Sequence, residues 1–412
     1  MKVLLSAEIM WPWLLLASLQ AAANEPPAFR SERALVVVDV AVLDAKGTPV
    51  RGLTQDDFTV LEDGLEQPIT TFEGVMPLDG GRVTGAPART GSSPDGRLPD
   101  PALPPRRTIA IVFDDPNLTL GQGERVKTAV ADLLEAHTAA GDEVWLISPS
   151  IGLGRGARLP EGAEGLFSVL RSVKGRRVVD RSAQGMGDIE AQDIHVRLDK
   201  TVEDRVLRRF LAQDPNLSFG DPERVRPLVQ ARATEVYADA EKRIRMTLAV
   251  LESALDRLAG RKGRKSLVLA SSGFPYEGAL PGFRRVLGAS LRANTAIYFL
   301  DARGLQGLAP FQDVETAAAV DPPDIFGTRL GEGLATQGAE VLAVDTGGFT
   351  IRNTSDLTKG LRLIADTASA YYLIGYDPAK ATRSGEFRKI QVRLNHRNKG
   401  LEVMARRGYV AP

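Results

Sequence analysis

The sequence predicts a doubly wound α/β domain with a mostly parallel sheet, inserted into a small β-sandwich built from both ends of the mature chain. The middle of the chain alternates helices with strands that are apolar throughout, as in a parallel sheet covered on both faces. Both ends carry short strands in which apolar and polar residues alternate. Neither end has enough strands for a stable sandwich, so we expect the two ends to pair.

The predicted α/β domain covers residues 106–370. Its strands are expected at 108–115, 143–150, 265–274 and 296–304, with a short one at 348–353. The helix after the first strand places Val126 and Val130 on one face, and a later helix, 235–259, ends at Gly260. These repeated strand and helix units predict a sheet wound in both directions.

Two segments within this domain depart from the repeat. Residues 174–234 form a predicted insertion, in which only "TVEDRVLRRFLAQDP" has a helical pattern. The segment "GLGRGARL", residues 152–159, has spaced glycines after a strand but lacks the ending of a phosphate-binding loop. We expect it to be a flexible loop.

The predicted sandwich has its two halves at residues 24–75 and 371–412. In the first half Val36 and Val38 share one strand face, and strands of the second half alternate in the same way. Residues 76–105 are rich in Gly, Pro, Ser and Asp and have few large apolar side chains. Such a segment cannot bury enough surface to fold, so a flexible linker is expected.

Residues 1–23 have the pattern of a secretory signal peptide. Lys2 precedes an apolar stretch at 9–19, and small residues at 21–23 provide a cleavage site. Initiation at Met10 and a retained membrane anchor are the alternatives. No later stretch is apolar over the ~20 residues that a bilayer-spanning helix needs. We therefore expect an exported protein, periplasmic or extracellular, with no transmembrane segment after the signal peptide.

The composition narrows the classes of partner and cofactor. The 412 residues include 52 Lys and Arg against 52 Asp and Glu, and no cysteine. A balanced charge gives no global field toward nucleic acid or an anionic membrane, so no nucleic-acid partner is expected. Without cysteine there is no disulfide, thiolate metal site or cysteine nucleophile. Any bound metal would be an ion with oxygen ligands.

Polar side chains gather where the predicted parallel strands end, and such sheets bind ligands at the carboxyl ends of their strands. The candidates, in chain order of the strands they follow, are Asp114, Asp115, Asn117 and Thr119, then Ser148 and Ser150, then Ser271 and Ser272, and finally Asp301 and Arg303. We take Asp114, Ser271 and Asp301 as candidates on the rim of a binding surface.

Several segments together resemble the von Willebrand factor type A domains, and within them a bacterial exported group of VWFA-related domain proteins. They are "VVDVAVLDAKGTPVRGLTQDDFTVLEDG", "IAIVFDDPNLT", "GRKSLVLASSGF", "ANTAIYFLDARGL", "ASAYYLIGYDP", "FRKIQVRL" and "LEVMARRGY". The resemblance covers nearly all of the mature chain. It implies a doubly wound sheet, a flanking β module, and a role in binding or adhesion.

The type A family often holds Mg²⁺ or Mn²⁺ at an adhesion site, and the resemblance places a degenerate form of it here. Asp115, Asn117 and Thr119 match the first motif, with Asn and Thr in place of two serines. Ser272 stands where an aspartate is expected, and "GRGARLPEGAEGL" lacks the expected threonine. Fewer carboxylates lower the affinity for a divalent ion. The metal ligands implied are Asp115, Asn117, Thr119 and Ser272.

Other interpretations of the same residues stay open. Asp, Asn and Thr after a buried strand also form turns and helix caps. Neighbours on a strand point to opposite faces, so Asp114 and Asp115 are not expected to act as a catalytic pair. No Gly-x-Ser-x-Gly motif surrounds Ser271 or Ser272. We predict a non-catalytic protein that binds a protein or envelope surface; the alternatives are a metal-dependent hydrolase and a structural envelope component.

Overall fold

The computed structural model describes residues 35–77, 83–84, 107–180, 185–213, 221–261, 265–276, 281–305, 333–378, 386–395 and 400–410. The predicted signal peptide, 1–23, lies outside these residues. So does the predicted linker, 76–105, except at 76–77 and 83–84, where two strands pair. A short part of the expected linker is therefore a hairpin-like strand pair.

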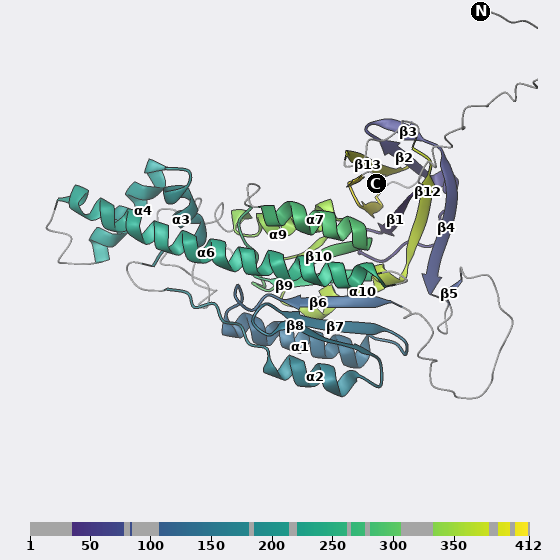
Figure 1. Cartoon of the computed structure of the whole chain (residues 1–412), viewed down its shortest axis with the longest axis horizontal. Helices are drawn as coiled ribbons and strands as arrows, with labels where there is room; N and C mark the ends of the chain where they lie inside the picture. Colours follow the sequence, from purple (N-terminus) through teal and green to yellow (C-terminus); the bar gives the residue numbers. More distant parts are fainter. Residues whose placement is uncertain are drawn as a thin grey trace, which may run out of the picture.

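A six-stranded sheet forms the centre of the molecule, in the order β11-β10-β9-β6-β7-β8 (Figure 1). Its strands are β6 (Thr108–Phe113), β7 (Glu143–Ser148), β8 (Gly152–Arg158), β9 (Lys265–Ser271), β10 (Thr295–Asp301) and β11 (Thr350–Ile351). All neighbours are parallel except β7 and β8. The prediction of a mixed α/β fold with a mostly parallel sheet is confirmed.

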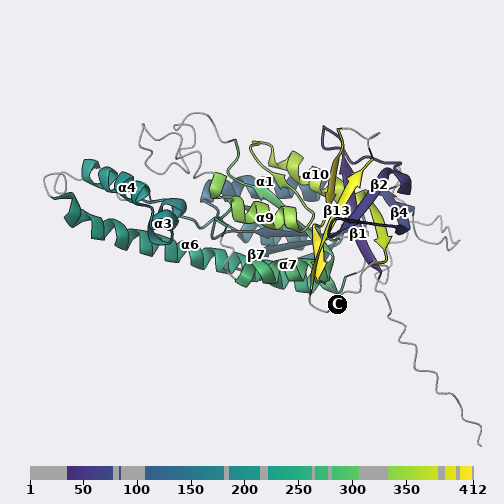
Figure 2. The same ribbon diagram turned by 90° about the horizontal axis from the view of Figure 1, so that it is seen from above.

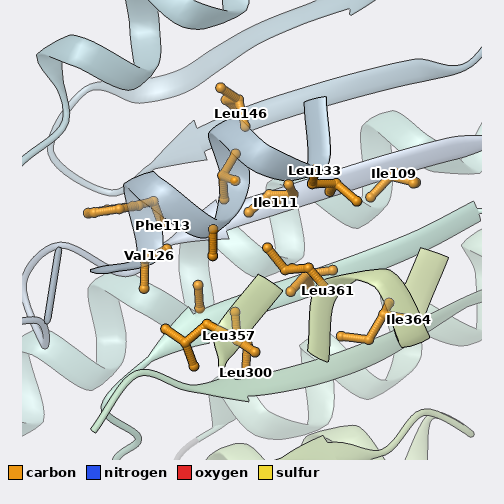
Figure 3. Packing of buried hydrophobic residues seen from close by; sticks show 14 of the residues in the cluster. Ile109, Ile111, Phe113, Val126, Leu133, Leu146, Leu300, Leu357, Leu361 and Ile364 are labelled. Carbon is orange, nitrogen blue, oxygen red and sulfur yellow. The ribbon is translucent and has the colours of Figure 1, made fainter. Parts of the chain in front are cut away.

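Helices cover both faces of this sheet. One face carries α1 (Leu120–Ala136), α2 (Ala163–Ser172) and α10 (Leu357–Ser369); the other carries α6 (Pro222–Ala259), α7 (Pro281–Ala293) and α9 (Gln337–Asp345). Figure 3 shows the first core, to which Ile111 of β6, Leu133 of α1 and Leu361 of α10 all contribute. Alternate residues of β6 enter opposite cores, Ile111 one and Val112 the other, which explains why the strand is apolar throughout.

The predicted loop at 152–159 is instead the edge strand β8, and that prediction was wrong. β8 pairs antiparallel with β7, and its glycines provide the close approach. A Cβ at Gly154 would lie 1.6 Å from the carbonyl oxygen of Leu146, and one at Gly156 would meet the ring of Trp145 at 2.3 Å. The spaced glycines thus allow backbone packing rather than flexibility.

Strands from the two ends of the chain pair in two antiparallel sheets, ordered β14-β1-β12-β4-β5 and β15-β13-β2-β3. Their bounds are β1 (Val36–Leu43), β2 (Phe58–Glu62), β3 (Leu65–Gln67), β4 (Ile69–Pro77), β5 (Val83–Thr84), β12 (Tyr371–Tyr376), β13 (Phe387–Leu394), β14 (Glu402–Ala405) and β15 (Gly408–Val410), with a short 3₁₀ helix η1 (Gln55–Asp57) before β2. Val38 and Tyr372 of one sheet share a core with Val60 and Ile390 of the other.

The predicted insertion contains a helical arm that extends away from the sheet (Figures 1 and 2). It consists of α3 (Asp188–His195), α4 (Lys200–Gln213) and the first part of α6. α6 begins at Pro222, well before the expected residue 235, and Asp221 caps it. The arm has its own small core, to which Phe210 of α4 and Val229 of α6 both contribute.

The arm and the antiparallel sheets lie at opposite ends of the six-stranded sheet (Figure 1). At the amino end of β10, Asn294 donates to Asp39 of β1. At the carboxyl end of β6, Arg243 of α6 donates to Asn117. The strand ends that hold the predicted rim residues therefore face the base of the arm. No helix in the described part of the chain is both long enough and apolar enough to cross a membrane.

Candidate functional site

Asp114 follows β6 directly and is completely buried. Three side chains donate hydrogen bonds to its carboxylate: Ser271 Oγ at 2.5 Å, Thr247 Oγ1 at 2.6 Å and Asn117 Nδ2 at 2.9 Å. Burial raises the pKa of Asp114 to about 6, although these hydrogen bonds act in the opposite direction. Asp114 thus joins β6, β9 and α6 at the base of the arm.

Asp115 points to other partners. Its Oδ1 accepts from Ser148 Oγ at 2.7 Å and from the backbone N–H of Ser150 at 3.3 Å, and its Oδ2 lies 3.2 Å from Arg176 Nε. Asp115 and Asp114 therefore bind separate sets of donors, as expected, but β6 ends at Phe113, before the predicted end at 115, so the turn after the strand rather than strand alternation separates them. The arrangement offers no converging pair of carboxylates for acid–base chemistry.

Asn117 and Thr119 hold local structure. The carbonyl oxygen of the Asn117 side chain accepts from Arg243 Nε at 3.3 Å. Thr119 caps α1: its Oγ1 accepts from the backbone N–H of Gln122 at 3.3 Å, and the Gln122 side chain accepts from the Thr119 N–H at 3.0 Å. This reciprocal pair is a capping box, so the turn-and-cap interpretation of the segment is observed at Thr119.

The remaining candidates, the predicted metal ligand Ser272 and the rim candidate Asp301, lie in two places. Ser272 Oγ donates to the carbonyl oxygen of Asn117 at 2.6 Å and so belongs with the residues around β6. Asp301, at the end of β10, is buried in an ion pair with Arg303 at 2.8 Å. The structure thus brings together Asp114, Asp115, Asn117, Ser271 and Ser272, whereas Asp301 forms a separate interaction.

The side chains around Asp115 do not fit a divalent cation. A hard cation requires several free oxygen ligands, preferably anionic. Here Arg176 already supplies the positive charge at Asp115, the Thr119 oxygen caps a helix, and Ser272 donates to a carbonyl. Among the residues that the structure describes, no three histidine, aspartate or glutamate side chains are grouped so that they could hold a metal ion.

A second ion-pair cluster, which the sequence interpretation missed, connects the start of the arm to the segment after α2 and to α6. Asp188, at the start of α3, accepts from Arg177 Nη2 at 3.0 Å and from Arg243 Nη2 at 2.9 Å. Burial would raise the pKa of Asp188, but the two guanidinium groups outweigh it and hold this pKa below its ordinary value. We call Asp188, Arg177 and Arg243 the arm clamp.

The segment between α2 and the arm lies directly across the Asp115 loop. The backbone N–H of Arg176 donates to the Asp115 carbonyl at 2.9 Å, and that of Arg177 donates to the Leu118 carbonyl at 2.8 Å. A Cβ at Gly175 would lie only 2.0 Å from the Thr119 carbonyl oxygen. Glycine is therefore required for this close approach. It places residues 174–178, which we call the basic segment, against the loop that carries the predicted metal ligands.

Exposed apolar side chains lie on loops at this end of the sheet. Large apolar residues are exposed on loops or helix ends that follow four of its strands, and on the basic segment: Leu120, Ile151, Val178, Tyr276 and Leu305. Single exposed apolar residues are ordinary, but several on loops that leave one edge of a sheet indicate an interaction surface. We call these five residues the apolar rim.

The residues that the sequence interpretation missed come from distant segments. Thr247 and Arg243 lie one helical turn apart on α6, so a shared face was predictable, but not that this face meets β6. The one signal for Arg176 and Arg177 was the basic run "KGRR".

Comparison of the chain with protein-family models gave no match, and comparison with curated proteins gave none either.

Proposed function

We propose that the chain is an exported, non-catalytic binding protein that recognises a protein partner through the carboxyl end of its six-stranded sheet. The observation that carries this proposal is the apolar rim, which lies on the loops at that end. Protein interfaces require a patch of apolar side chains that can be desolvated. The proposal includes a type A-like fold for this domain, which the quoted sequence motifs support.

The burial of the two carboxylates supports a non-catalytic role. Asp114 is 0% exposed and Asp115 is 1% exposed, and each is bound by several protein donors. A hydrolase that used this rim would need at least one carboxylate, or a metal held by it, within reach of substrate. The donors around Asp114 and Asp115 instead connect β6 to its neighbours.

A site-specific photo-crosslinking experiment tests the proposal. A benzophenone amino acid is introduced at Ile151 of the full chain, and the protein is irradiated in an envelope extract of the source cells. Leu65 is the matched control, because its exposed fraction of 47% is close to the 46% of Ile151 while it lies on β3 of the antiparallel sheets. We expect a discrete crosslinked protein from Ile151 alone.

Equal crosslinking from both positions, or none from Ile151, would contradict recognition at the rim. In that case a structural envelope component becomes the better interpretation. A wild-type chain that cleaved ester or phosphate substrates in the presence of Mg²⁺ or Mn²⁺, and lost this activity in Asp115→Ala, would instead support the metal-dependent hydrolase.

A further inference from the structure

We infer that the rim binds an acidic segment of its protein partner through the guanidinium group of Arg176, without a metal ion. This inference rests on the proposed function and names the chemistry of its ligand. Arg176 pairs with Asp115 through Nε, yet its side chain is 63% exposed. Because the guanidinium group has five N–H donors in a planar fork, its terminal nitrogens can bind a second carboxylate from solvent.

The structure holds Arg176 in place before any ligand arrives. Its backbone N–H is bound to the Asp115 carbonyl, and the preceding Gly175 is packed against Thr119. Its Nε is fixed at 3.2 Å from a carboxylate that is itself held by Ser148. A side chain that is already ordered loses less conformational entropy when it binds, which favours affinity.

Close to Arg176, the paired carboxylates lie inside and the cations outside, although Asp180 further along the segment is 38% exposed in an ion pair with Arg232. Asp115 is buried and Asp188 is partly buried, whereas Arg176 is exposed and Lys174 beside it is also exposed. A partner therefore meets guanidinium and ammonium groups before it meets the carboxylates that pair with them. Complementary charge favours an anionic ligand at this point.

Apolar residues flank Arg176 on both sides. Val178, two residues along the segment, is 90% exposed, and Ile151 follows Ser150, whose backbone N–H binds the same Asp115 carboxylate. When a partner covers Val178 and Ile151, water is excluded around the guanidinium group. The ion pair then strengthens because the local dielectric constant falls.

These features favour an acidic protein segment over a nucleic acid. Nucleic-acid binding relies on many phosphate contacts and an extended basic surface. The chain has equal numbers of basic and acidic residues, and the basic run around Arg176 is short and has the exposed apolar residues Val178 and Ile151 near it. The ligand that fits is an aspartate or glutamate side chain with apolar neighbours.

Binding of a fluorescent poly-L-glutamate peptide to the full chain, followed by fluorescence anisotropy in buffer containing EDTA, tests the inference. We expect Arg176→Gln to weaken binding about tenfold, the loss of one charge-assisted hydrogen-bonded pair. Arg292→Gln is the matched control, since Arg292 is also 63% exposed and pairs with Asp256 at 3.1 Å on the surface of α7. It should bind like wild type.

Several outcomes would overturn the inference: no binding of the peptide, equal losses in both variants, or binding that appears only when EDTA is replaced by Mg²⁺ or Mn²⁺. Tighter, Arg176-dependent binding of a single-stranded oligonucleotide of equal length would replace the acidic protein with a nucleic acid. A thermal melt of Arg176→Gln that matches wild type shows that its fold is intact. If it does not match, Arg176→Lys provides the second variant, expected to retain part of the affinity because the charge remains.

The two proposals fail separately. If Ile151 crosslinks a discrete partner and the peptide does not bind, the ligand chemistry is wrong and recognition at the rim stands. If Ile151 crosslinks nothing and Arg176 still binds the peptide, Arg176 is an anion site without a partner at the rim, and the proposed function fails.

Discussion

The body of the molecule and the helical arm are stabilised in different ways, although α6 runs through both. In the body, Leu251 of α6 packs in one of two large cores that enclose the six-stranded sheet. In the arm, Val229 of the same helix packs in a much smaller cluster. The part of α6 between them, from Arg243 to Thr247, makes polar contacts to the strand ends.

This difference indicates where the molecule can open locally. Small clusters with few buried apolar contacts open at lower free energy than central strands and the helices packed on them. The arm depends on its own core for internal order and on the arm clamp, with Asn117 and Asp114, for its position. We therefore expect changes in the arm core, in the Asp114 cluster and in the arm clamp to affect distinct parts of the molecule.

The largest effect is expected from Phe210→Ala in the arm core. Phe210 is almost fully buried there, and such a truncation lowers the free energy of unfolding by about 3–5 kcal/mol. Because the arm has a separate core, we expect amide hydrogen exchange to speed up in α3, α4 and the first part of α6. Exchange in β6 and β9 should be unchanged.

Leu251→Ala is the control in the body. Leu251 is fully buried against the sheet, and its truncation should lower the free energy of global unfolding by about 2–5 kcal/mol, including the protection of β6 and β9. If Phe210→Ala also reduced protection in β6 and β9, the arm and body would unfold as one unit, and the comparison would be wrong.

The next effect concerns pH and Asp114. Its pKa is raised to about 6 in the folded chain from an ordinary value of 3.8, so between these values the folded state holds more protons than the unfolded state. The stabilisation is complete below about pH 4 and is lost as the pH rises through about 6. The difference in pKa corresponds to about 3 kcal/mol.

Asp114→Asn removes this titration. We expect wild type to lose about 3 kcal/mol of unfolding free energy relative to this variant between pH 4 and pH 7, because only wild type must ionise a buried carboxyl group. Urea unfolding of both proteins across this range measures the difference. The lost hydrogen bonds produce a constant offset, so parallel curves for the two proteins would show that Asp114 is not the titrating group.

The sequence was sufficient to predict the features that depend on local pattern. Continuous apolar strands such as Thr108–Phe113 predicted a sheet covered on both faces, and the alternation of Val36 and Val38 predicted strands with one buried face. Asp114 and Asp115 diverge as expected, but the expectation rested on a strand that reached 115, whereas β6 ends at Phe113. The type A identity and the exported location stay predictions.

The features that depend on contacts between distant segments could not be predicted in this way. Thr247 reaches Asp114 across more than a hundred residues, and Arg243 reaches Asp188 across an insertion of unclear pattern. The glycines at 154 and 156 indicated a loop because their close neighbours, Leu146 and Trp145, lie on another strand. In each case the partner, rather than the local pattern, determines the structure.

The smallest effect is expected from Asp188→Asn in the arm clamp. The asparagine keeps the shape of the side chain but leaves Arg177 and Arg243 without their shared anion. A hydrogen-bonded ionic contact of this kind contributes about 2 kcal/mol. Hydrogen exchange at pH 7 should show faster opening in α3 and the first part of α6, with the body unaffected.

The low pKa of Asp188 gives this prediction a second test. Because the folded-state pKa lies below the ordinary value, the clamp stabilises the arm above about pH 4 and loses this contribution as the pH falls further. Asp204→Asn, which removes an exposed ion pair with Arg226 on the same arm, should change arm opening much less. Equal effects of the two substitutions would mean that the arm clamp contributes no more to the position of the arm than an exposed ion pair does.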